Sequence, residues 1–423
     1  MNLAIFSALS SYLRVRCFSH KIRNRASLAA WQKKQLANWL KNDLPKVKAF
    51  SEYGDQTIEL SDLPIMEKSD LMTDFARYNN QNVTNEQGWA AFETSKQIGD
   101  FIVGASTGTS GNRGLFVISQ IERFKWLGTI LAKAIPTFWR QKNRIAVLLP
   151  IDTPLYDSAN HVRLLEIKFF DINFPLEEIS AELEAFNPTI LIAPPRILRR
   201  FCETPTKLLP RLLFSAAEKL EEFDREIIEH KFGAPLREIY MATEGLLGVS
   251  CSHNKLHLCE DCMHFEFMQV GENLVSPVIS DFSRKTQIMA RYRLNDLLRL
   301  DSDPCPCGSP LMVVSEIIGR QDDVFSLIGQ NDKHVEITPD ILRNVIVDTD
   351  RDISDFRLLQ TGPLNLELQL PDYCSFEVKQ LVRERLNQLL GKHGVSPDVK
   401  ITHTPVEPQT ARKLRRVERC WFP

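Results

Sequence analysis

The chain lacks a long apolar run, a large net charge and a regular cysteine pattern. None of its apolar stretches approaches the roughly 20 residues that a membrane-spanning helix needs. The 52 Lys and Arg nearly balance the 54 Asp and Glu, for a net charge of -2, whereas nucleic-acid binding needs a concentrated basic surplus. The nine cysteines are odd in number and unevenly spaced, which disfavours a disulfide framework and favours a reducing compartment. We therefore expect a cytoplasmic protein with no transmembrane segment and no nucleic-acid partner.

The composition is that of an ordinary globular protein, with 423 residues, 43% of them hydrophobic and 25% charged. This length is enough for two domains, and no internal repeat or low-complexity tract interrupts it. The apolar residues 1–9 suggest a signal peptide, but they lack a basic leader, and Arg14 and Arg16 follow too soon. We predict an amphipathic helix that packs against the domain, with peripheral membrane contact as the alternative.

Strand-like and helix-like patterns alternate through the middle of the chain. Residues up to 75 are mainly helical in pattern, and a strand-like run at 101–103 precedes a glycine-rich loop. Beyond the loop, the pattern predicts helices at 121–139, at 179–186 and up to residue 230, and strands at 145–149, 189–193, 212–214 and 238–241. Such alternation predicts parallel α/β layers.

The pattern changes after Asp323 to a βαββαβ-like order, with strands predicted at 324–328, 356–359, 365–370 and 399–402 and helices at 339–347 and 376–390. We place a domain boundary and hinge at residues 321–323, which gives an N-terminal domain at 1–320 and a C-terminal domain at 321–423. The predicted fold class is α/β: a large layered α/β domain followed by a small, mobile α+β domain.

The segment at residues 104–114 is rich in Gly, Ser and Thr and directly follows an apolar run. Glycines allow backbone N–H groups to turn toward an anion, and hydroxyls add uncharged donors. Both features are typical of a phosphate-binding loop. A Ser/Thr/Gly segment is nevertheless more often a surface turn, and this one lacks the Gly-Lys-Ser/Thr ending of the common NTPase loop. The motifs downstream favour the phosphate-binding interpretation.

Three further motifs follow in order: Tyr-Met-Ala-Thr-Glu-Gly at 240–245, Tyr-Arg-Leu-Asn-Asp at 292–296 and Ile-Gly-Arg-Gln-Asp-Asp at 318–323. Together with the loop, they resemble the successive nucleotide-site motifs of the adenylate-forming (ANL) superfamily. The resemblance is closest to the phenylacetate-CoA ligase-like branch, which includes the synthetases that adenylylate a deazaflavin coenzyme. It covers nearly the whole chain, with early marks at 31–36 and 63–71 and a late one at 408–417.

The resemblance implies an ATP site at which a carboxylate attacks the α-phosphorus and expels pyrophosphate. Glu244 would hold Mg²⁺, a hard cation that prefers oxygen ligands, and Thr243 would donate to the α-phosphate, with Tyr240 and Ala242 in the same nucleotide-binding segment. The alternative is that Glu244 caps the next helix, but α/β sheets place their ligands at strand ends. The residues expected to close over the β- and γ-phosphates are Ser106, Thr107, Gly108, Thr109, Ser110 and Gly111.

The segment Ser215, Ala216, Ala217 and Glu218 is similar to the family's adenine-side segment. Small residues there let a flat base approach the backbone. Alanine replaces glycine at both central positions of this chain, so the path of the backbone is an open question.

Asp296 is expected to accept hydrogen bonds from the ribose hydroxyls, because a carboxylate can take two donors at once. Arg320 is expected to reach the same sugar or the α-phosphate. The alternative is that Arg320 and Asp322 form a surface ion pair at a hinge, of the kind worth only ~0–1 kcal/mol.

Lys413 is the candidate catalytic lysine of the C-terminal domain. Its ammonium would bridge the substrate carboxylate and the α-phosphate, and the domain would then rotate, with Asp323 as the hinge residue. Arg412 stands where the family usually has glycine, and Arg415 and Arg416 follow. The alternative is therefore that this basic run is a solvated face.

A structural zinc site is implied by the resemblance at Cys251, His257, Cys305 and Cys307. Sulfur and imidazole ligands in two short clusters fit a tetrahedral site. Such a zinc would fasten a loop and lie outside the reaction centre. Ordinary buried thiols are the alternative, and the other cysteines and histidines nearby leave the ligand set open: Cys259, Cys262, His253 and His264.

The resemblance therefore implies an AMP-forming carboxylate ligase that uses ATP and Mg²⁺ to make an acyl-adenylate and passes it to CoA or a carrier-protein thiol. One alternative is a synthetase that leaves AMP on its substrate or sends the acyl group to an amine. Another is a non-catalytic nucleotide-binding homologue. That alternative is disfavoured because the chain retains Glu244, Asp296, Arg320 and Lys413. No motif identifies the carboxylic acid substrate, the acceptor or the oligomeric state.

Overall fold

The computed structural model of the chain describes residues 3–54, 56–106, 113–149, 164–350, 353, 356–402 and 415–422. The chain forms two compact units: residues 1–294 with 300–315, and residues 295–299 with 316–423. The first contains the large sheet, and the second is a smaller C-terminal unit with a sheet of its own. The predicted α/β class, with a large and a small part, is confirmed.

The chain begins with two long helices, α1 (Leu3–Lys21) and α2 (Arg25–Asn42). Asn24 caps α2, because its side chain accepts a hydrogen bond from the Ser27 N–H at 2.8 Å. The helices that follow are short: η1 (Leu44–Lys46), η2 (Lys48–Tyr53), η3 (Leu60–Asp62), α3 (Lys68–Thr73), η4 (Phe75–Tyr78) and α4 (Asn85–Glu93).

A small antiparallel sheet contains β1 (Gln97–Ile98), β2 (Phe101–Ala105) and β3 (Leu115–Ser119). Gly104 of β2 pairs with Phe116 of β3. A Cβ atom at position 104 would lie 2.2 Å from the Phe116 ring, so this close approach requires glycine. The connection between β2 and β3 is the predicted phosphate loop.

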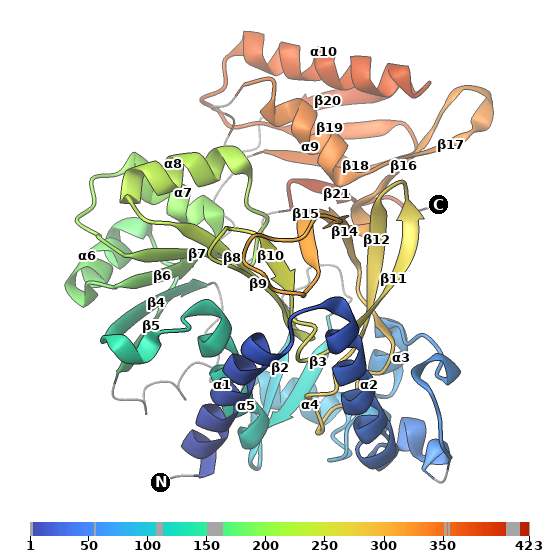
Figure 1. Cartoon of the computed structure of the whole chain (residues 1–423). Coiled ribbons are helices and arrows are strands. Elements are labelled where there is room, and N and C mark those ends of the chain that lie inside the picture. The colour runs from blue at the N-terminus through green and yellow to red at the C-terminus, as the bar shows by residue number, and fades with distance from the viewer. Residues whose placement is uncertain are drawn as a thin grey trace. The chain divides into compact units, whose positions relative to one another are not determined.

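The main sheet has twelve strands among the described residues, in the order β11-β12-β14-β15-β10-β9-β8-β7-β6-β4-β5, with β13 beside β12. The strands from β5 to β8 in this order are parallel, as the alternating pattern predicts. Helices on both faces cover them (Figure 1). The elements of this half are α5 (Gln120–Ala134), η5 (Phe138–Arg140), β4 (Asn143–Leu149), β5 (Leu165–Asp171), α6 (Leu176–Phe186), β6 (Ile190–Ala193), α7 (Pro195–Glu203), β7 (Leu212–Ala216), α8 (Glu222–Phe232) and β8 (Leu236–Ala242).

Two apolar clusters fill the two faces of the parallel strands. Leu148 and Leu191 pack on the face covered by α6, α7 and α8, whereas Val147 and Ile190 pack on the face covered by α5 and α1. Because successive side chains of a strand point to opposite faces, a strand buried on both sides is apolar throughout. The continuous apolar runs in the sequence have this cause.

Some predicted elements need correction. The helix predicted at 121–139 ends at Ala134, because Pro136 disfavours helical geometry in Ile135. Strand β5 and helix α7 were not predicted. The strand β5 alternates charged and apolar residues, and Pro195 starts α7, so neither has a long periodic signal.

The strands after β8 continue the sheet with mainly antiparallel pairs. The last two of them, β14 and β15, carry the chain from the first unit into the second. Their bounds are β9 (Gly245–Ser250), β10 (Leu256–Leu258), β11 (His264–Gly271), β12 (Leu274–Ser280), β13 (Tyr292–Arg293), β14 (Asp296–Asp301) and β15 (Val313–Arg320).

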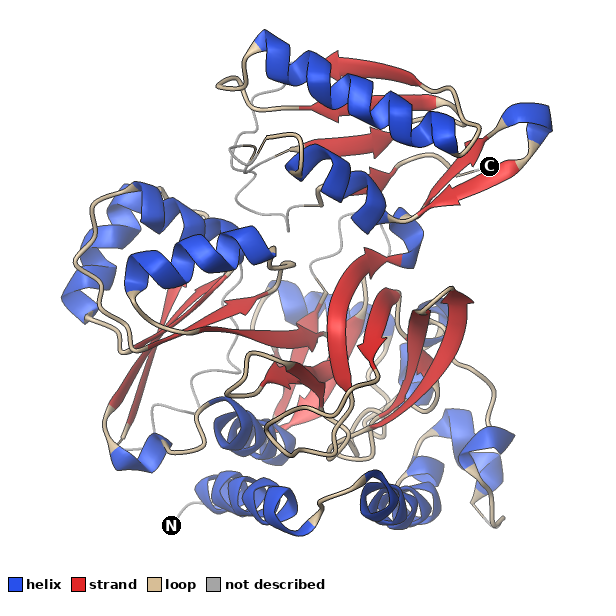
Figure 2. Ribbon diagram, turned by 45° about the horizontal axis from the view of Figure 1, so that its top comes forward, coloured by secondary structure: helices blue, strands red, loops and turns tan. Residues whose placement is uncertain are grey.

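The second unit has its own apolar core, in which Leu342 and Ile346 of α9 and Leu386 of α10 pack against strands of a four-stranded sheet. The sheet order is β20-β19-β18-β21, and both helices lie along one of its faces (Figure 2). A separate hairpin precedes it. The bounds are η7 (Gln321–Asp323), β16 (Phe325–Ile328), η8 (Gln330–Asp332), β17 (His334–Ile337), α9 (Pro339–Val347), β18 (Arg357–Gln360), β19 (Asn365–Gln369), α10 (Phe376–Lys392), β20 (Asp398–Thr402) and β21 (Val417–Arg419).

Among the helices that the structure describes, none combines the length and the apolar character needed to cross a bilayer.

Candidate nucleotide site

Two of the predicted nucleotide segments end side by side at the carboxyl edge of the parallel strands. The strands β7 and β8 are parallel neighbours, with Ser215 paired with Glu238 and Ala216 with Ile239. The continuation of β7 at Ala217 therefore lies beside the end of β8, where Tyr240 begins the next motif. Open α/β sheets bind ligands at this edge.

Thr243 and Glu244 form the tip of the tight turn between β8 and β9. Ala242 pairs with Gly245 across the turn, which leaves only these two residues between the strands. Gly245 has a φ of 141°, a conformation that side chains rarely adopt. The turn thus places the Glu244 carboxylate at the end of a strand, and Glu244 caps no helix, because a strand follows it.

Tyr292 of β13 is hydrogen-bonded to the Glu244 side chain. The residue is only 2% exposed. Burial, followed by the charge of Glu244 and a hydrogen bond to it, raises the pKa of Tyr292 well above its ordinary value. The hydroxyl therefore keeps its proton and donates to the carboxylate, which fixes the orientation of Glu244.

Arg284 fastens the other side of the same turn. Its Nη2 donates to the Thr243 carbonyl at 3.1 Å, and its Nε lies 3.5 Å from the Asp281 carboxylate. Burial raises the pKa of Asp281, and Arg284 opposes that rise. Sequence reasoning missed Arg284 and Asp281, since they belong to no motif, and it assigned no role to Tyr292 although the 292–296 motif contains it.

The adenine-side segment keeps a glycine-like backbone despite its alanines. Ala217 has a φ of 70°, in the left-handed region that favours glycine. The next residue, Glu218, is held by Arg196 of α7, with 2.9 Å between the Arg196 Nε and a carboxylate oxygen. The Oγ of Ser215 is buried and has no hydrogen-bond partner in the described part of the chain. Buried hydroxyls usually have one, so Ser215 could serve a bound ligand.

The base of the predicted phosphate loop is closed by hydrogen bonds between Ser106 and Gly114. The Ser106 N–H donates to the Gly114 carbonyl and the Gly114 N–H donates to the Ser106 Oγ, both at 2.8 Å. Arg113 adds a bond to the Ser106 carbonyl at 3.1 Å and stacks on the Trp89 ring at 4.9 Å. The remaining predicted loop residues, Thr107, Gly108, Thr109, Ser110 and Gly111, lie outside the described residues.

Within the second unit, the structure brings the two predicted ribose residues onto neighbouring strand ends. Asp296 begins β14 and Arg320 ends β15. The Gln321 N–H donates to the Asn295 carbonyl at 2.8 Å, so the two ends lie side by side. Asp322 is bonded to the Asn295 side chain at 2.5 Å, and no ion pair joins Asp322 to Arg320 among the residues described.

Asp323, the predicted hinge residue, is 5% exposed and forms an ion pair with Arg415. Arg415 also contacts Glu418 of β21 at 2.8 Å. Burial raises the pKa of Asp323, and Arg415 and then Arg320 oppose that rise. Lys413 and Arg412 lie outside the described residues, but the chain resumes after them at a residue that is anchored to Asp323.

Cys251, His257, Cys305 and Cys307 converge, with all four possible ligand atoms within 4.8 Å of one another. The Cys251 and Cys305 sulfurs are 3.7 Å apart, and the Cys307 sulfur is 3.4 Å from the His257 Nε2. Two thiolates bound tetrahedrally to one zinc at about 2.3 Å would be about 3.8 Å apart. The spacing and the donor chemistry therefore fit zinc.

Hydrogen bonds around these four residues favour metal binding. The His257 Nδ1 faces the Leu311 carbonyl at 3.0 Å, which leaves Nε2 free to act as a ligand. Burial alone would raise the pKa of Cys251, but hydrogen bonds from His257 and from the His253 and Lys255 backbone lower it to about 6. A thiolate is the form that binds zinc. At Cys307, in contrast, burial raises the pKa of the thiol to about 12.

Three of the four alternative ligands lie elsewhere, whereas His253 adjoins the cluster, its backbone N–H donating to the Cys251 sulfur at 3.3 Å. Cys259 and Cys262 belong to the apolar core beneath α5, where burial raises the pKa of Cys259 to about 12 and that of Cys262 as well. His264 faces the Gln32 side chain at 3.2 Å. All nine cysteines are free thiols.

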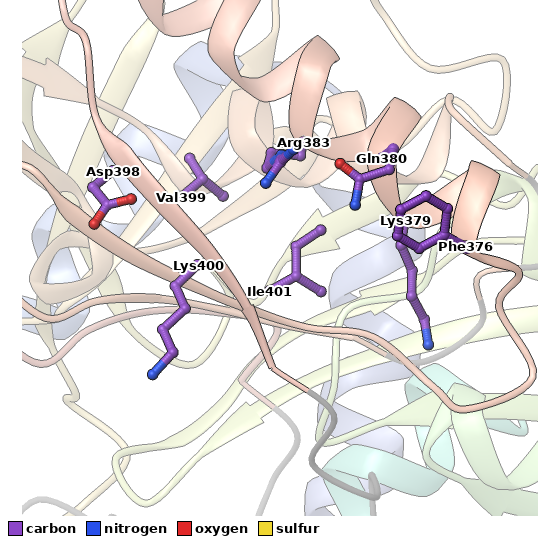
Figure 3. Close-up of a pocket in the computed structure, with 8 residues that line it drawn as sticks. All are labelled: Phe376, Lys379, Gln380, Arg383, Asp398, Val399, Lys400 and Ile401. Atoms are coloured by element: carbon purple, nitrogen blue, oxygen red, sulfur yellow. The ribbon is translucent and has the colours of Figure 1, made fainter.

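An open pocket of about 430 Å³ lies in the second unit between α10 and β20 (Figure 3). Val399 and Ile401 contribute apolar side chains to it, and Phe376 lines it from the start of α10. The basic residues around it are Lys379, Arg383 and Lys400. Neither Asp296 nor Arg320 lines this pocket, so it is separate from the predicted ribose residues of the same unit.

Comparison with known proteins gives a limited match in sequence. No family model matches the chain. Protein CapK of Staphylococcus aureus is 27% identical over 116 residues, which are 27% of this chain and 26% of that protein. The match thus spans about a quarter of the length of this curated relative.

Solved structures match over much more of the chain. The crystal structure of 2-hydroxyisobutyryl-CoA ligase in the postadenylation state, in complex with 2-HIB-AMP, has a TM-score of 0.65 at 17% identity and covers 93% of this chain and 88% of its own. The structure of fatty acyl-adenylate ligases from E. coli and L. pneumophila has a TM-score of 0.54 at 14% identity and covers 74% of this chain and 67% of its own. A benzoate CoA ligase from Burkholderia xenovorans LB400 has a TM-score of 0.52 at 14% identity and covers 72% of this chain and 66% of its own. The chain therefore has the fold of the adenylate-forming ligases, as its ordered motifs predicted.

Proposed function

We propose that this protein is an AMP-forming carboxylate ligase. It activates a carboxylic acid with ATP to an acyl-adenylate, releases pyrophosphate, and passes the acyl group to CoA or a carrier-protein thiol. The work of the site is to hold the two reactants in line and to neutralise phosphate charge, because phosphoryl and nucleotidyl transfer need little more from a protein.

The observation that carries the proposal is the position of Glu244. Its carboxylate stands at the tip of the β8–β9 turn, at the carboxyl edge of the parallel strands, and is oriented by the buried Tyr292 hydroxyl. A carboxylate fixed there suits Mg²⁺, which would supply positive charge to the phosphates. In the same account Thr243 donates to the α-phosphate, and the segment Ser215 to Glu218 receives the adenine beside Tyr240.

The second unit supplies the ribose contacts and the catalytic lysine in this proposal. Asp296 accepts from the ribose hydroxyls, Arg320 contacts the sugar or the α-phosphate, and Lys413 bridges the two reacting groups during adenylation. A rotation at residues 321–323 then removes Lys413 from the face that the acceptor must reach. The zinc at Cys251, His257, Cys305 and Cys307 has a structural role only.

The test is a screen of carboxylic acids by ATP–pyrophosphate exchange with purified protein and Mg²⁺. The proposal expects exchange that depends on one class of acid and that stops when Mg²⁺ is removed. If the protein binds ATP but shows no exchange with any acid tested, that result would contradict an acid-activating function and favour a non-catalytic homologue.

The acceptor is identified by following AMP once an acid is known. Release of AMP only after addition of CoA or a carrier protein supports thiol transfer. Release of pyrophosphate without AMP, with AMP recovered on the substrate, would contradict it and favour a synthetase that leaves AMP in place.

A further inference from the structure

Helix α1 has two apolar sides. One of them is buried within the first unit. The buried side includes Ala8, Tyr12 and Val15, and it packs on α5. The contact is close: a Cβ atom at Gly128 of α5 would lie 2.0 Å from the Ala8 carbonyl oxygen. The Tyr12 hydroxyl also donates to the Pro136 carbonyl at 2.6 Å. The helix is therefore fixed in one rotation about its axis.

The opposite side of α1 carries an exposed apolar stripe of Phe6, Leu9 and Leu13. Their exposed fractions are 55%, 44% and 51%. They are spaced i, i+3 and i+7, which at about 3.6 residues per turn places them on one line along the helix. Single exposed apolar residues are common on protein surfaces. Three in one line, opposite the packed side of the helix, form a continuous exposed apolar surface.

Basic residues flank this stripe. At helical spacing, Arg16 lies on one side of Leu13, and Arg14 and Lys21 lie on the other. No ion pair of these three cations is found in the described part of the chain. Long basic side chains can lie along an apolar surface while their charged ends reach anionic groups.

The charge of the whole N-terminal segment is one-sided. Residues 1–42 contain eight Lys and Arg and no Asp or Glu, whereas the full chain has a net charge of -2. Both views place α1 and α2 along the same edge of the first unit (Figures 1 and 2). Helix α2 also carries exposed basic residues, among them Lys33 and Lys34.

We propose that the stripe of Phe6, Leu9 and Leu13, with its basic flanks, is a docking surface for an anionic lipid membrane. Three apolar side chains bind an interface weakly, and neighbouring basic residues each strengthen the attachment to anionic lipid. A second copy of the chain would bring two positive surfaces together, which like-charge repulsion opposes. Nucleic acid would satisfy the charges but leave the apolar stripe without a partner.

The test is co-sedimentation of the full chain with vesicles of phosphatidylcholine alone or with about 30% phosphatidylglycerol. We expect binding to the anionic vesicles, little binding to the neutral ones, and a loss of at least about tenfold in bound fraction at about 0.5 M salt. Equal binding to both vesicle types, or to neither, would overturn the proposal.

Two double variants separate the contributions of charge and apolar contact. Leu9→Ser with Leu13→Ser, and Arg14→Gln with Arg16→Gln, should each lower the vesicle partition coefficient about tenfold. Leu209→Ser is the matched control, because Leu209 is 82% exposed in the loop before β7, and it should bind as the wild type does. Unchanged thermal melting shows that each variant is folded.

Two further results would overturn the assignment of the surface. If light scattering shows a dimer that the leucine variant abolishes, the stripe belongs to a second copy of the chain. If duplex DNA binds the wild type and displaces it from vesicles while the leucine variant binds DNA equally well, the surface recognises phosphate charge alone.

Discussion

Glu244 is the residue whose charge matters most in the proposed reaction. Glu244→Gln preserves the shape of the side chain and its contact with Tyr292 but removes the negative charge. We expect acid-dependent ATP–pyrophosphate exchange to slow roughly 100-fold, the scale of losing one electrostatic contact to the transition state, with the largest deficit at limiting Mg²⁺. ATP binding measured by calorimetry should change less.

The control for this variant is Glu272→Gln, which changes an exposed glutamate in the turn between β11 and β12. It should exchange at the wild-type rate. If Glu244→Gln exchanged equally fast at low Mg²⁺, Glu244 would have no role in metal-assisted chemistry.

Ala217 is a strained residue within the proposed adenine-binding segment. Its φ of 70° is unfavourable for a residue with a Cβ atom. Ala217→Gly should therefore raise the free energy of unfolding by about 0.5–1 kcal/mol, the relief of strain exceeding the added entropy of the unfolded chain. Chemical denaturation measures the difference.

The neighbouring Ala216→Gly is the contrasting variant, because residue 216 is a buried strand residue without a positive φ. It should lower the free energy of unfolding by about 1 kcal/mol. Destabilisation by both variants to a similar degree would show that the left-handed conformation at 217 is incorrect.

The start of helix α5 depends on one buried carboxylate. Glu122 accepts hydrogen bonds from the Ser119 N–H at 2.7 Å, the Lys285 N–H at 2.6 Å and the Thr286 hydroxyl at 2.5 Å. Burial alone would raise the pKa of Glu122, but these bonds outweigh it and lower the pKa. The ionised carboxylate thus joins α5 to the 285–286 loop.

Glu122→Gln should lower the free energy of unfolding by about 2–3 kcal/mol at pH 7, because the amide presents donors to donors. A lowered pKa in the folded state stabilises the protein above the unfolded value of 4.5 and loses this effect as pH falls through the folded value. The difference between variant and wild type should shrink below about pH 4.5. Glu86→Gln, an exposed first-turn glutamate of α4, should change stability little, and a pH-independent difference at position 122 would contradict the account.

The loop between β14 and β15 is an element that zinc would hold. Protein purified without chelator should contain about one zinc per chain, as one four-ligand site requires. Cys305→Ser with Cys307→Ser should remove the zinc and lower the melting temperature by roughly 5–10 °C. Elemental analysis together with melting curves measures both effects.

Cys17→Ser with Cys420→Ser is the matched double variant, since both thiols are exposed and lie apart from the four candidate ligands. It should keep its zinc and its melting temperature. Well-folded wild-type protein without zinc would end the idea of a structural zinc site.

Long periodic elements of the fold could be predicted from the sequence, whereas weakly periodic ones could not. The strand at 145–149 and the helix at 339–347 were predicted because continuous apolar runs and a 3.6-residue period are strong signals. The hairpin strand β17 was missed, since its four residues alternate polar and apolar over too short a span. The antiparallel half of the main sheet depends on long-range pairing, which no local pattern reveals.

Some residues of the candidate site could likewise be predicted from sequence motifs, whereas others could not. The residues at the ends of β7 and β8 were found because they belong to ordered motifs. Arg284 and Asp281 were missed because their role arises only when the loop after β12 folds back onto the β8–β9 turn. Of the eight candidate Cys and His ligands, tertiary structure brings four together and buries Cys259 and Cys262 in the core instead, which the spacing in the sequence does not reveal.

At the scale of the whole molecule, the proposed reaction needs both units, and Lys413 is the test of that cooperation. Its ammonium is needed during adenylation and obstructs the acceptor afterwards, so one domain must be used in two positions. Lys413→Ala should abolish adenylate formation while retaining transfer from a supplied acyl-adenylate. If folded Lys413→Ala protein lost both transfer and adenylation, Lys413 would not be specific to the adenylation step.

Adenylate formation is measured in a single-turnover reaction with α-phosphate-labelled ATP, Mg²⁺ and the acid found by exchange, with no acceptor present. The wild type should form bound acyl-adenylate and pyrophosphate in equal amounts, and AMP should appear only when a thiol acceptor is added. Lys413→Ala should form neither product. Formation of ADP and phosphate, or an adenylate made at the normal rate by Lys413→Ala, would contradict the proposed reaction.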